Sequence, residues 1–324
     1  MTVYSRREFL KHAVAGAGAL LFGEHGRAVS SSHTYCFLAH ETLTSKERAS
    51  LEQLLEARSE DHFARITRFE NGMRIAEDPP APPHLIYAIY IDSSDAPSRL
   101  LGMLTAQVIN EEGFFLTAQH LRMADAPGIH YIMHDVTRGT YAIPTFIAES
   151  QRDDLLLGKT VPEQAYGHDI RIAPWENGVS GSPAYSASYP MHSTQWKSAV
   201  EEESERMRIA DLIEADKANP AFHHHPTGGR SDVEVNRGYV LDEFYWQYQC
   251  DSYELEPDSI CIRAPARPGD SGSPFYDRQG NLLSILCRTR VLAQSRGIEP
   301  VHQEIAIGPH PSRIRALIEE MISI

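Results

Sequence analysis

The chain has 324 residues and carries 30 Lys and Arg against 44 Asp and Glu, a formal net charge of −14 at pH 7 with His neutral. Hydrophobic residues make up 42% and charged residues 23% of the sequence, which is ordinary globular usage and argues against disordered, collagen-like or coiled-coil structure. An acidic chain without a basic stripe repels phosphate backbones, so nucleic acid is not expected as a partner. The length allows two packed units.

Residues 1–28 have the parts of an export signal. The segment Ser5-Arg-Arg-Glu-Phe-Leu-Lys11 precedes a mildly apolar run that ends at Phe22, and small residues lie near Ala28. It resembles a twin-arginine signal peptide, which implies recognition by the twin-arginine export machinery and a periplasmic or secreted protein. The alternative is an amphipathic helix with a chance Arg pair. An apolar run of about eleven residues is short for a hydrocarbon core of about 30 Å, so no permanent membrane span is expected.

Residues 29–83 are predicted to form a helical extension followed by a stiff linker. Thr44-Ser-Lys-Glu47 is a capping box, and apolar residues recur after it at helical spacing, which predicts a helix over about 45–68. The proline-rich stretch 77–83 cannot continue a helix or form a central strand. Whether 29–83 is a removable pro-segment stays open.

Beyond the linker the sequence is rich in short β-type runs. In 84–165 they cover 85–91, 100–109 and 113–117, and turn residues separate them. Regular short strands of this kind are typical of a barrel or sandwich.

A second β-rich unit is predicted over 166–324. Its helical insertion over about 190–235 contains an amphipathic segment at 197–216, and a further helix is predicted at 311–322. Strand, Gly-Asn turn and strand are predicted over 275–286.

Three segments carry residues that suit acyl transfer. Phe115-Leu-Thr-Ala-Gln-His120 ends a β-run with a histidine, Asp154-Leu-Leu-Leu-Gly-Lys159 opens an apolar run with an acid, and Gly269-Asp-Ser-Gly-Ser-Pro274 sets a serine among glycines. This chemistry needs a hydroxyl activated by an imidazole, an acid that orients the imidazole, and donors for the oxyanion. The adjacent Asp153 is the alternative acid.

These segments resemble the motifs of the trypsin/chymotrypsin-like serine peptidases, which also use the chain order His, Asp, Ser. The resemblance implies a mainly β, two-barrel fold, with barrels at 84–165 and 166–324. It implies that His120 is the general base, Asp154 the orienting acid and Ser271 the nucleophile, with the N–H groups of Gly269 and Ser271 as the oxyanion hole. Asp154 is preferred to Asp153 because Lys159 then falls at the spacing of the family motif. Ser273 in place of a family glycine points to a bacterial, glutamyl-endopeptidase-like branch.

The same family pattern suggests where a substrate pocket would lie. Its candidate residues are Pro265, Arg267, Leu286 and Arg288. Trypsin-like members keep an acid six residues before the serine, where this chain has Pro265, so a preference for basic substrate side chains is not expected. The arginines would suit an acidic substrate side chain or serve only solubility.

The motif around Ser271 has an echo in Gly178-Val-Ser-Gly-Ser-Pro183. Only 26 positions separate Asp154 from Ser180. That is too short for most of a second barrel, because strands of about five residues need turns between them. We therefore predict that Ser180 lies in a turn at the start of the second unit.

No disulfide or metal follows from the remaining candidate residues. Cys36, Cys250, Cys261 and Cys287 allow three complete pairings, among which a bridge between Cys250 and Cys261 across a hairpin is possible, and separate thiols are equally open. Adjacent imidazoles such as those of 223–225 rarely converge on one ion, so no metal is expected.

The sequence thus predicts an exported serine endopeptidase that acts on a peptide or protein substrate without a cofactor. A binding or scaffold protein with an inactive peptidase fold is the alternative, in which the helices at 45–68 and 197–216 would dock a partner. An esterase with the same triad is a further alternative, since an oxyanion hole does not require an amide substrate.

Overall fold

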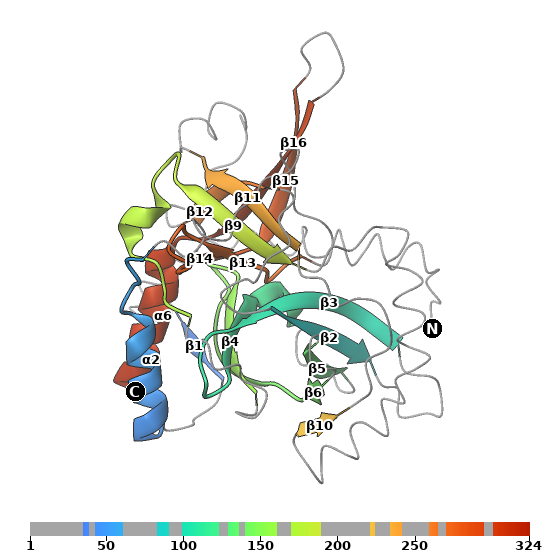
Figure 1. The fold of residues 1–324 in the computed structure, drawn as a ribbon. Coiled ribbons are helices and arrows are strands. Elements are labelled where there is room, and N and C mark those ends of the chain that lie inside the picture. Colours follow the sequence, from blue (N-terminus) through green and yellow to red (C-terminus); the bar gives the residue numbers. More distant parts are fainter. Residues whose placement is uncertain are drawn as a thin grey trace, which may run out of the picture. The chain divides into compact units, whose positions relative to one another are not determined.

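The computed structural model describes residues 35–38, 43–60, 83–90, 99–122, 129–135, 140–160, 170–188, 221–223, 234–241, 259–264, 270–294 and 301–324. These residues form two antiparallel sheets and two helices of ten residues or more, so the predicted mainly β fold is confirmed at this level (Figure 1). The predicted signal peptide at 1–28 and the predicted helix at 197–216 lie outside the described residues.

The first sheet has nine strands in the spatial order β1-β7-β8-β4-β3-β2-β5-β6-β10. They are β1 (Cys36–Phe37), β2 (His84–Tyr90), β3 (Arg99–Val108), β4 (Phe114–Ala118), β5 (Ile129–Asp135), β6 (Thr140–Ala142), β7 (Thr145–Ser150), β8 (Leu155–Lys159) and β10 (Ala221–His223). The predicted strands 85–91, 100–109 and 113–117 are confirmed as β2, β3 and β4, each within one residue. Strand β10 lies within the insertion predicted over about 190–235 and outside the helix predicted at 197–216; its backbone pairs with β6 and forms the edge of this sheet.

The second sheet has seven strands in the order β14-β13-β9-β11-β12-β16-β15. They are β9 (Pro183–Ser188), β11 (Glu234–Val240), β12 (Ser259–Arg263), β13 (Pro274–Tyr276), β14 (Leu282–Ile285), β15 (Arg288–Gln294) and β16 (Val301–Pro309). The strand, turn and strand predicted over 275–286 are confirmed as β13 and β14.

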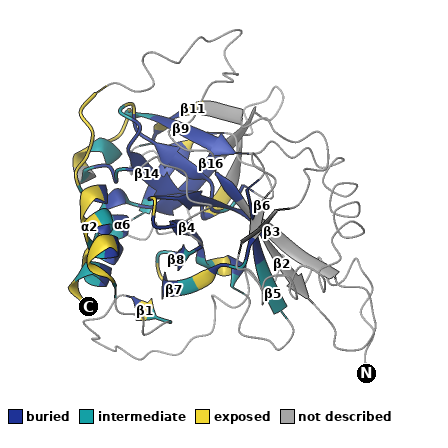
Figure 2. Cartoon of the chain, turned by 60° about the horizontal axis from the view of Figure 1, so that its bottom comes forward, coloured by how far each residue is buried: buried dark blue, intermediate teal, exposed yellow. Residues whose placement is uncertain are grey.

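The largest apolar cluster among the described residues contains side chains from both sheets and both helices. Strand β4 is buried along its whole length, and Figure 2 shows it in the buried interior with β9 and β14. Core residues from β4, β8, β13 and β14 pack in one cluster with Leu51 and Leu54 of helix α2 (Ser45–Leu54) and with Ile314 and Leu317 of helix α6 (Pro311–Ser323). Helices α2 and α6 lie side by side against this core (Figure 1). The predicted helix at 311–322 is therefore confirmed as α6.

Helix α2 begins where its sequence predicts and ends earlier. The Thr44 side chain accepts from the N–H of Glu47, and the Glu47 carboxylate accepts from the N–H of Thr44, so the capping box is confirmed. The predicted extension over 55–60 is wrong, and 61–68 lies outside the described residues.

The early end of α2 has a cause in tertiary hydrogen bonds. The Leu54 carbonyl accepts from the N–H of Ile172, and the Leu55 carbonyl accepts from Arg315 of α6. Helix carbonyls that are satisfied by other parts of the chain no longer need a further helical turn.

None of the helices in the described part of the chain has both the length and the apolar character that crossing a membrane requires.

We expect Glu47→Gln to destabilise the protein at neutral pH and much less at low pH. Burial alone would raise the pKa of Glu47, but hydrogen bonds from Lys159 and Thr44 outweigh it and hold the pKa below its ordinary value of 4.5. A carboxyl with a lowered pKa stabilises the fold above that ordinary value, and this stabilisation is lost as the pH falls through the lowered pKa.

The difference in unfolding free energy between the wild type and Glu47→Gln should be about 1 kcal/mol at pH 7. Urea unfolding at pH 7 and at successive values below 4.5 measures it. Glu52→Gln, on the exposed side of the same helix, is the control and should change stability by less than about 0.5 kcal/mol. An undiminished difference at low pH would contradict the assignment.

Candidate active site

His120 lies where the buried strand β4 reaches the surface. It belongs to the short 3-10 helix η1 (Gln119–Leu121), and its side chain is 36% exposed. Its backbone N–H donates to Oδ1 of Asp154 at 2.7 Å, and its ring nitrogen Nδ1 lies 2.7 Å from Oδ2 of the same carboxylate. A carboxylate oxygen only accepts, so in the neutral imidazole this contact puts the ring proton on Nδ1 and leaves Nε2 as an acceptor.

The pairing of β4 with β8 explains why Asp154 meets His120. Ala118 at the end of β4 faces Leu155 at the start of β8, so the residues just beyond each strand lie at the same edge of the sheet. The N–H of Gln119 donates to the Asp154 carbonyl at 3.0 Å. Asp154 has a φ of 51°, in the left-handed region, which Asp tolerates better than most residues. The structure thus brings Asp154 to His120, whereas the Asp153 side chain bonds Arg313 and Ser150.

A second carboxylate holds the residues on either side of His120. Glu149, near the end of β7, accepts from Arg122 Nη1 at 3.0 Å and from Gln119 Nε2 at 3.4 Å. Both partners flank His120 in sequence. The backbone of the histidine is therefore fixed on both sides.

Ser271 lies in a tight turn that is bonded to both sheets. The N–H of Ser273 donates to the Asp270 carbonyl at 2.8 Å, and Gly272 at the third position has a φ of 84°. Toward the first sheet, the Ser271 carbonyl accepts from the N–H of Thr105 in β3 at 2.8 Å. Toward the second, the N–H of Gly272 donates to the Leu286 carbonyl at 2.6 Å. Ser271 is partly exposed.

Thr105, which bonds the serine turn, is also bonded to β4, the strand that precedes His120. Thr117 in β4 donates its hydroxyl to the carbonyl of Thr105 at 2.7 Å, and Thr105 holds the Ser271 backbone. Thr117 precedes His120 by three positions. The backbone of Ser271 is therefore fixed at the same part of β3 and β4 from which the histidine emerges.

The echo around Ser180 forms the same turn in another setting. The N–H of Ser182 donates to the Val179 carbonyl at 3.1 Å, and Gly181 has a φ of 83°. Ser180 is exposed and directly precedes β9 of the second sheet. The predicted turn at the start of the second unit is confirmed.

The predicted pocket residues are only partly described. Leu286 is 2% exposed, and its side chain packs in a core cluster of the second sheet. The backbone of Leu286 is bonded to the serine turn, because its N–H donates to the Ser273 carbonyl at 2.8 Å. Arg288 is exposed at the start of β15. The remaining predicted site residues, which are Pro265, Arg267 and Gly269, lie outside the described residues.

Cys287 contacts the candidate acid and was not among the predicted site residues. Its Sγ lies 3.1 Å from the Asp154 carbonyl oxygen. Burial, assisted by the nearby charge of Asp154, raises the pKa of this thiol well above its ordinary value. It is therefore a protonated donor rather than a nucleophile. The chain separates Cys287 from Asp154 by 133 positions, so no local pattern could have indicated the contact.

Cys36 and Cys287 are unbridged thiols, and Cys261 is buried. Cys250 lies outside the described residues, as do His224 and His225. Within the described ranges, no group of three His, Cys, Asp or Glu side chains is arranged to hold a metal ion.

Comparison with known proteins adds no family to this geometry. No family model matches the chain, and no curated protein matches it.

Proposed function

We propose that the protein is an exported serine endopeptidase of the trypsin/chymotrypsin-like type, with the two sheets as its two barrels. One observation carries the proposal: the Asp154 carboxylate accepts from both the backbone N–H and the Nδ1–H of His120. Two bonds to one residue fix the tautomer and the direction of the ring. An ordinary surface ion pair does not need this arrangement.

In the proposed mechanism, Nε2 of His120 takes the proton of the Ser271 hydroxyl as Oγ attacks the substrate carbonyl. Asp154 stabilises the imidazolium that forms. The N–H groups of Gly269 and Ser271 would hold the oxyanion. His120 then returns the proton to the leaving amine, and water hydrolyses the acyl-enzyme by the reverse sequence. The chemistry needs no cofactor.

A fluorophosphonate probe tests the proposal, because only an activated serine displaces its fluoride. We expect the folded wild-type protein to be labelled, Ser271→Ala to lose all labelling, and Ser180→Ala to keep it. Mass spectrometry of the labelled peptide identifies the serine that reacts. A folded but unlabelled wild-type protein would overturn the proposal in favour of a binding or scaffold role. If the wild type is labelled, parallel assays on peptide and ester libraries distinguish an endopeptidase from an esterase.

A further inference from the structure

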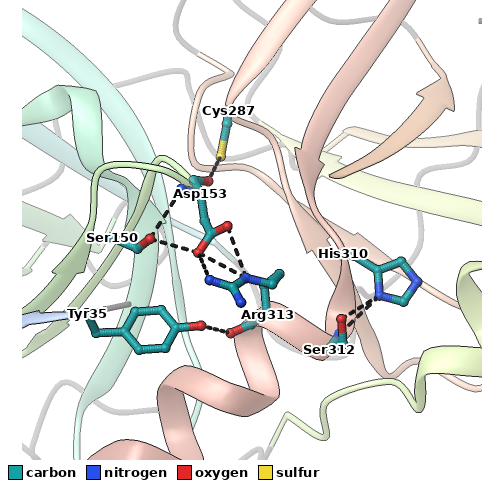
Figure 3. A network of polar contacts seen from close by, with 7 residues as sticks. All are labelled: Tyr35, Ser150, Asp153, Cys287, His310, Ser312 and Arg313. Atoms are coloured by element: carbon teal, nitrogen blue, oxygen red, sulfur yellow. Dashed lines mark hydrogen bonds and ion pairs between the residues drawn. The ribbon is translucent and has the colours of Figure 1, made fainter. Parts of the chain in front are cut away.

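The helix at the end of the chain contacts the turn that carries the candidate acid. Figure 3 shows Arg313 of α6 facing Asp153, which directly precedes Asp154. The guanidinium reaches both carboxylate oxygens: Nη2 lies 2.8 Å from Oδ2, and Nε lies 3.1 Å from Oδ1. The two side chains are only 15% and 4% exposed. This is a buried ion pair with two-point geometry, the kind that fixes orientation as well as position.

Both partners of this pair are held by further contacts. Ser150 donates its hydroxyl to Asp153 Oδ2 at 2.7 Å and accepts from the N–H of Asp153 at 3.2 Å. Tyr35 donates its hydroxyl to the Arg313 carbonyl at 2.7 Å, and its ring lies 5.6 Å from the guanidinium carbon. The N–H of Arg313 donates to the carbonyl of His310, which caps α6. The pair therefore joins two rigid supports, the end of β7 and the start of α6 (Figure 3).

The candidate acid lies in the turn between β7 and β8 and has a strained backbone conformation. Asp154 has a positive φ, which Asp adopts more readily than most residues but less readily than Gly. Its carbonyl is held by the N–H of Gln119 and by the thiol of Cys287. The pair with Arg313 fixes Asp153, the residue that directly precedes Asp154. A strained residue keeps its conformation only when its surroundings determine it from several directions.

We propose that Arg313 is a positioning residue, which holds the Asp154 carboxylate in place on His120 through Asp153. This inference rests on the proposed serine peptidase function. Buried ion pairs contribute weakly to net stability because desolvation offsets their attraction. A gain in stability therefore does not by itself explain the Arg313–Asp153 pair. Displacing a catalytic group by about 1 Å costs on the order of 100-fold in rate. The effect of the Arg313–Asp153 pair is to orient the Asp154 carboxylate.

Arg313→Lys tests the proposal, because it keeps the charge and loses the two-point geometry. We expect the maximal rate of fluorophosphonate labelling to fall roughly 10- to 100-fold, while the concentration of probe that gives half of that rate changes less than about twofold. Asp153→Asn should give the same pattern. The double variant should be no slower than the slower single variant, because both changes remove one interaction.

Arg315→Lys is the matched control on the same helix. Arg315 donates to the carbonyls of Leu55 and Ile172, away from the candidate triad. Arg315→Lys should lower the unfolding temperature by an amount similar to Arg313→Lys. It should leave labelling within about twofold of the wild-type rate, since Arg315 bonds backbone carbonyls away from the candidate triad. All variants are compared at a temperature where circular dichroism shows each to be folded.

The outcomes separate the two proposals. If the wild type is labelled and folded Arg313→Lys and Asp153→Asn are labelled at the wild-type maximal rate, the positioning role is overturned and the proposed function stands. The same holds if Arg315→Lys slows labelling as much, or if only the half-saturating probe concentration changes. If the wild type is not labelled at all, the proposed function fails and the positioning role with it.

Discussion

Asp154→Asn should reduce the rate of fluorophosphonate labelling by about four orders of magnitude, the usual effect of this change in an intact triad. The carboxylate now accepts two N–H groups of His120, each at 2.7 Å. An amide can offer one oxygen, and its NH₂ would then face the other donor. If the NH₂ faces Nδ1, that nitrogen becomes the acceptor and the ring proton moves to Nε2. The histidine then cannot take the proton from Ser271.

Glu149→Gln is the matched control for this change. It is the same replacement of an acid by its amide, at a carboxylate that is also buried and that accepts from the side chains of Gln119 and Arg122. It should cost about 1–3 kcal/mol of unfolding free energy, because Arg122 loses a charged partner. Labelling should stay within about tenfold of the wild-type rate, since the His120 tautomer is untouched. Equal losses in both variants would mean that Asp154 acts only by holding the fold together.

Local sequence patterns predicted the parts of this site that depend on neighbouring residues. The apolar runs before His120 and after Asp154 indicate buried strands, and β4 and β8 are such strands. The capping box and the Pro-initiated helix at 311–322 were predictable for the same reason, because helix termini are set by a few residues in sequence. His120 contacts Asp154 rather than Asp153 because of the register of β4 and β8. The preference for Asp154 in the sequence comes from the resemblance to the family motif, not from a local pattern.

Features that depend on distant partners could not be predicted. The end of α2 is set by donors from Ile172 and Arg315, which lie far along the chain. The partner of Asp153 is 160 positions away, on the last helix. Strand β10 forms by pairing with β6, and its three residues are too few to show a strand pattern in the sequence. In each case the cause lies in tertiary contact rather than in local propensity.

Gly272→Ala should destabilise the fold by at least about 3 kcal/mol and slow labelling severely, because steric overlap adds to backbone strain. The added Cβ would lie 1.8 Å from the Thr105 carbonyl oxygen and 2.4 Å from the Thr117 hydroxyl. These two groups hydrogen-bond each other, and the N–H of the same Thr105 donates to the Ser271 carbonyl. The Thr105 carbonyl is part of the β3 backbone and cannot move without shifting that strand, so the serine turn would have to leave its place.

Gly181→Ala separates the steric effect from the backbone strain. Gly181 occupies the same position in the echo turn with a φ of 83° against 84° for Gly272. Apart from its chain neighbours, no described residue has an atom within 4 Å of the Cβ that alanine would add. The strain alone should cost about 1–2 kcal/mol and leave labelling unchanged. Chemical unfolding and labelling rates of both variants measure the difference. Similar stability losses would contradict the docking of the Ser271 turn on β3, whereas a large loss confined to Gly272→Ala would support the contacts that distinguish the two serine motifs.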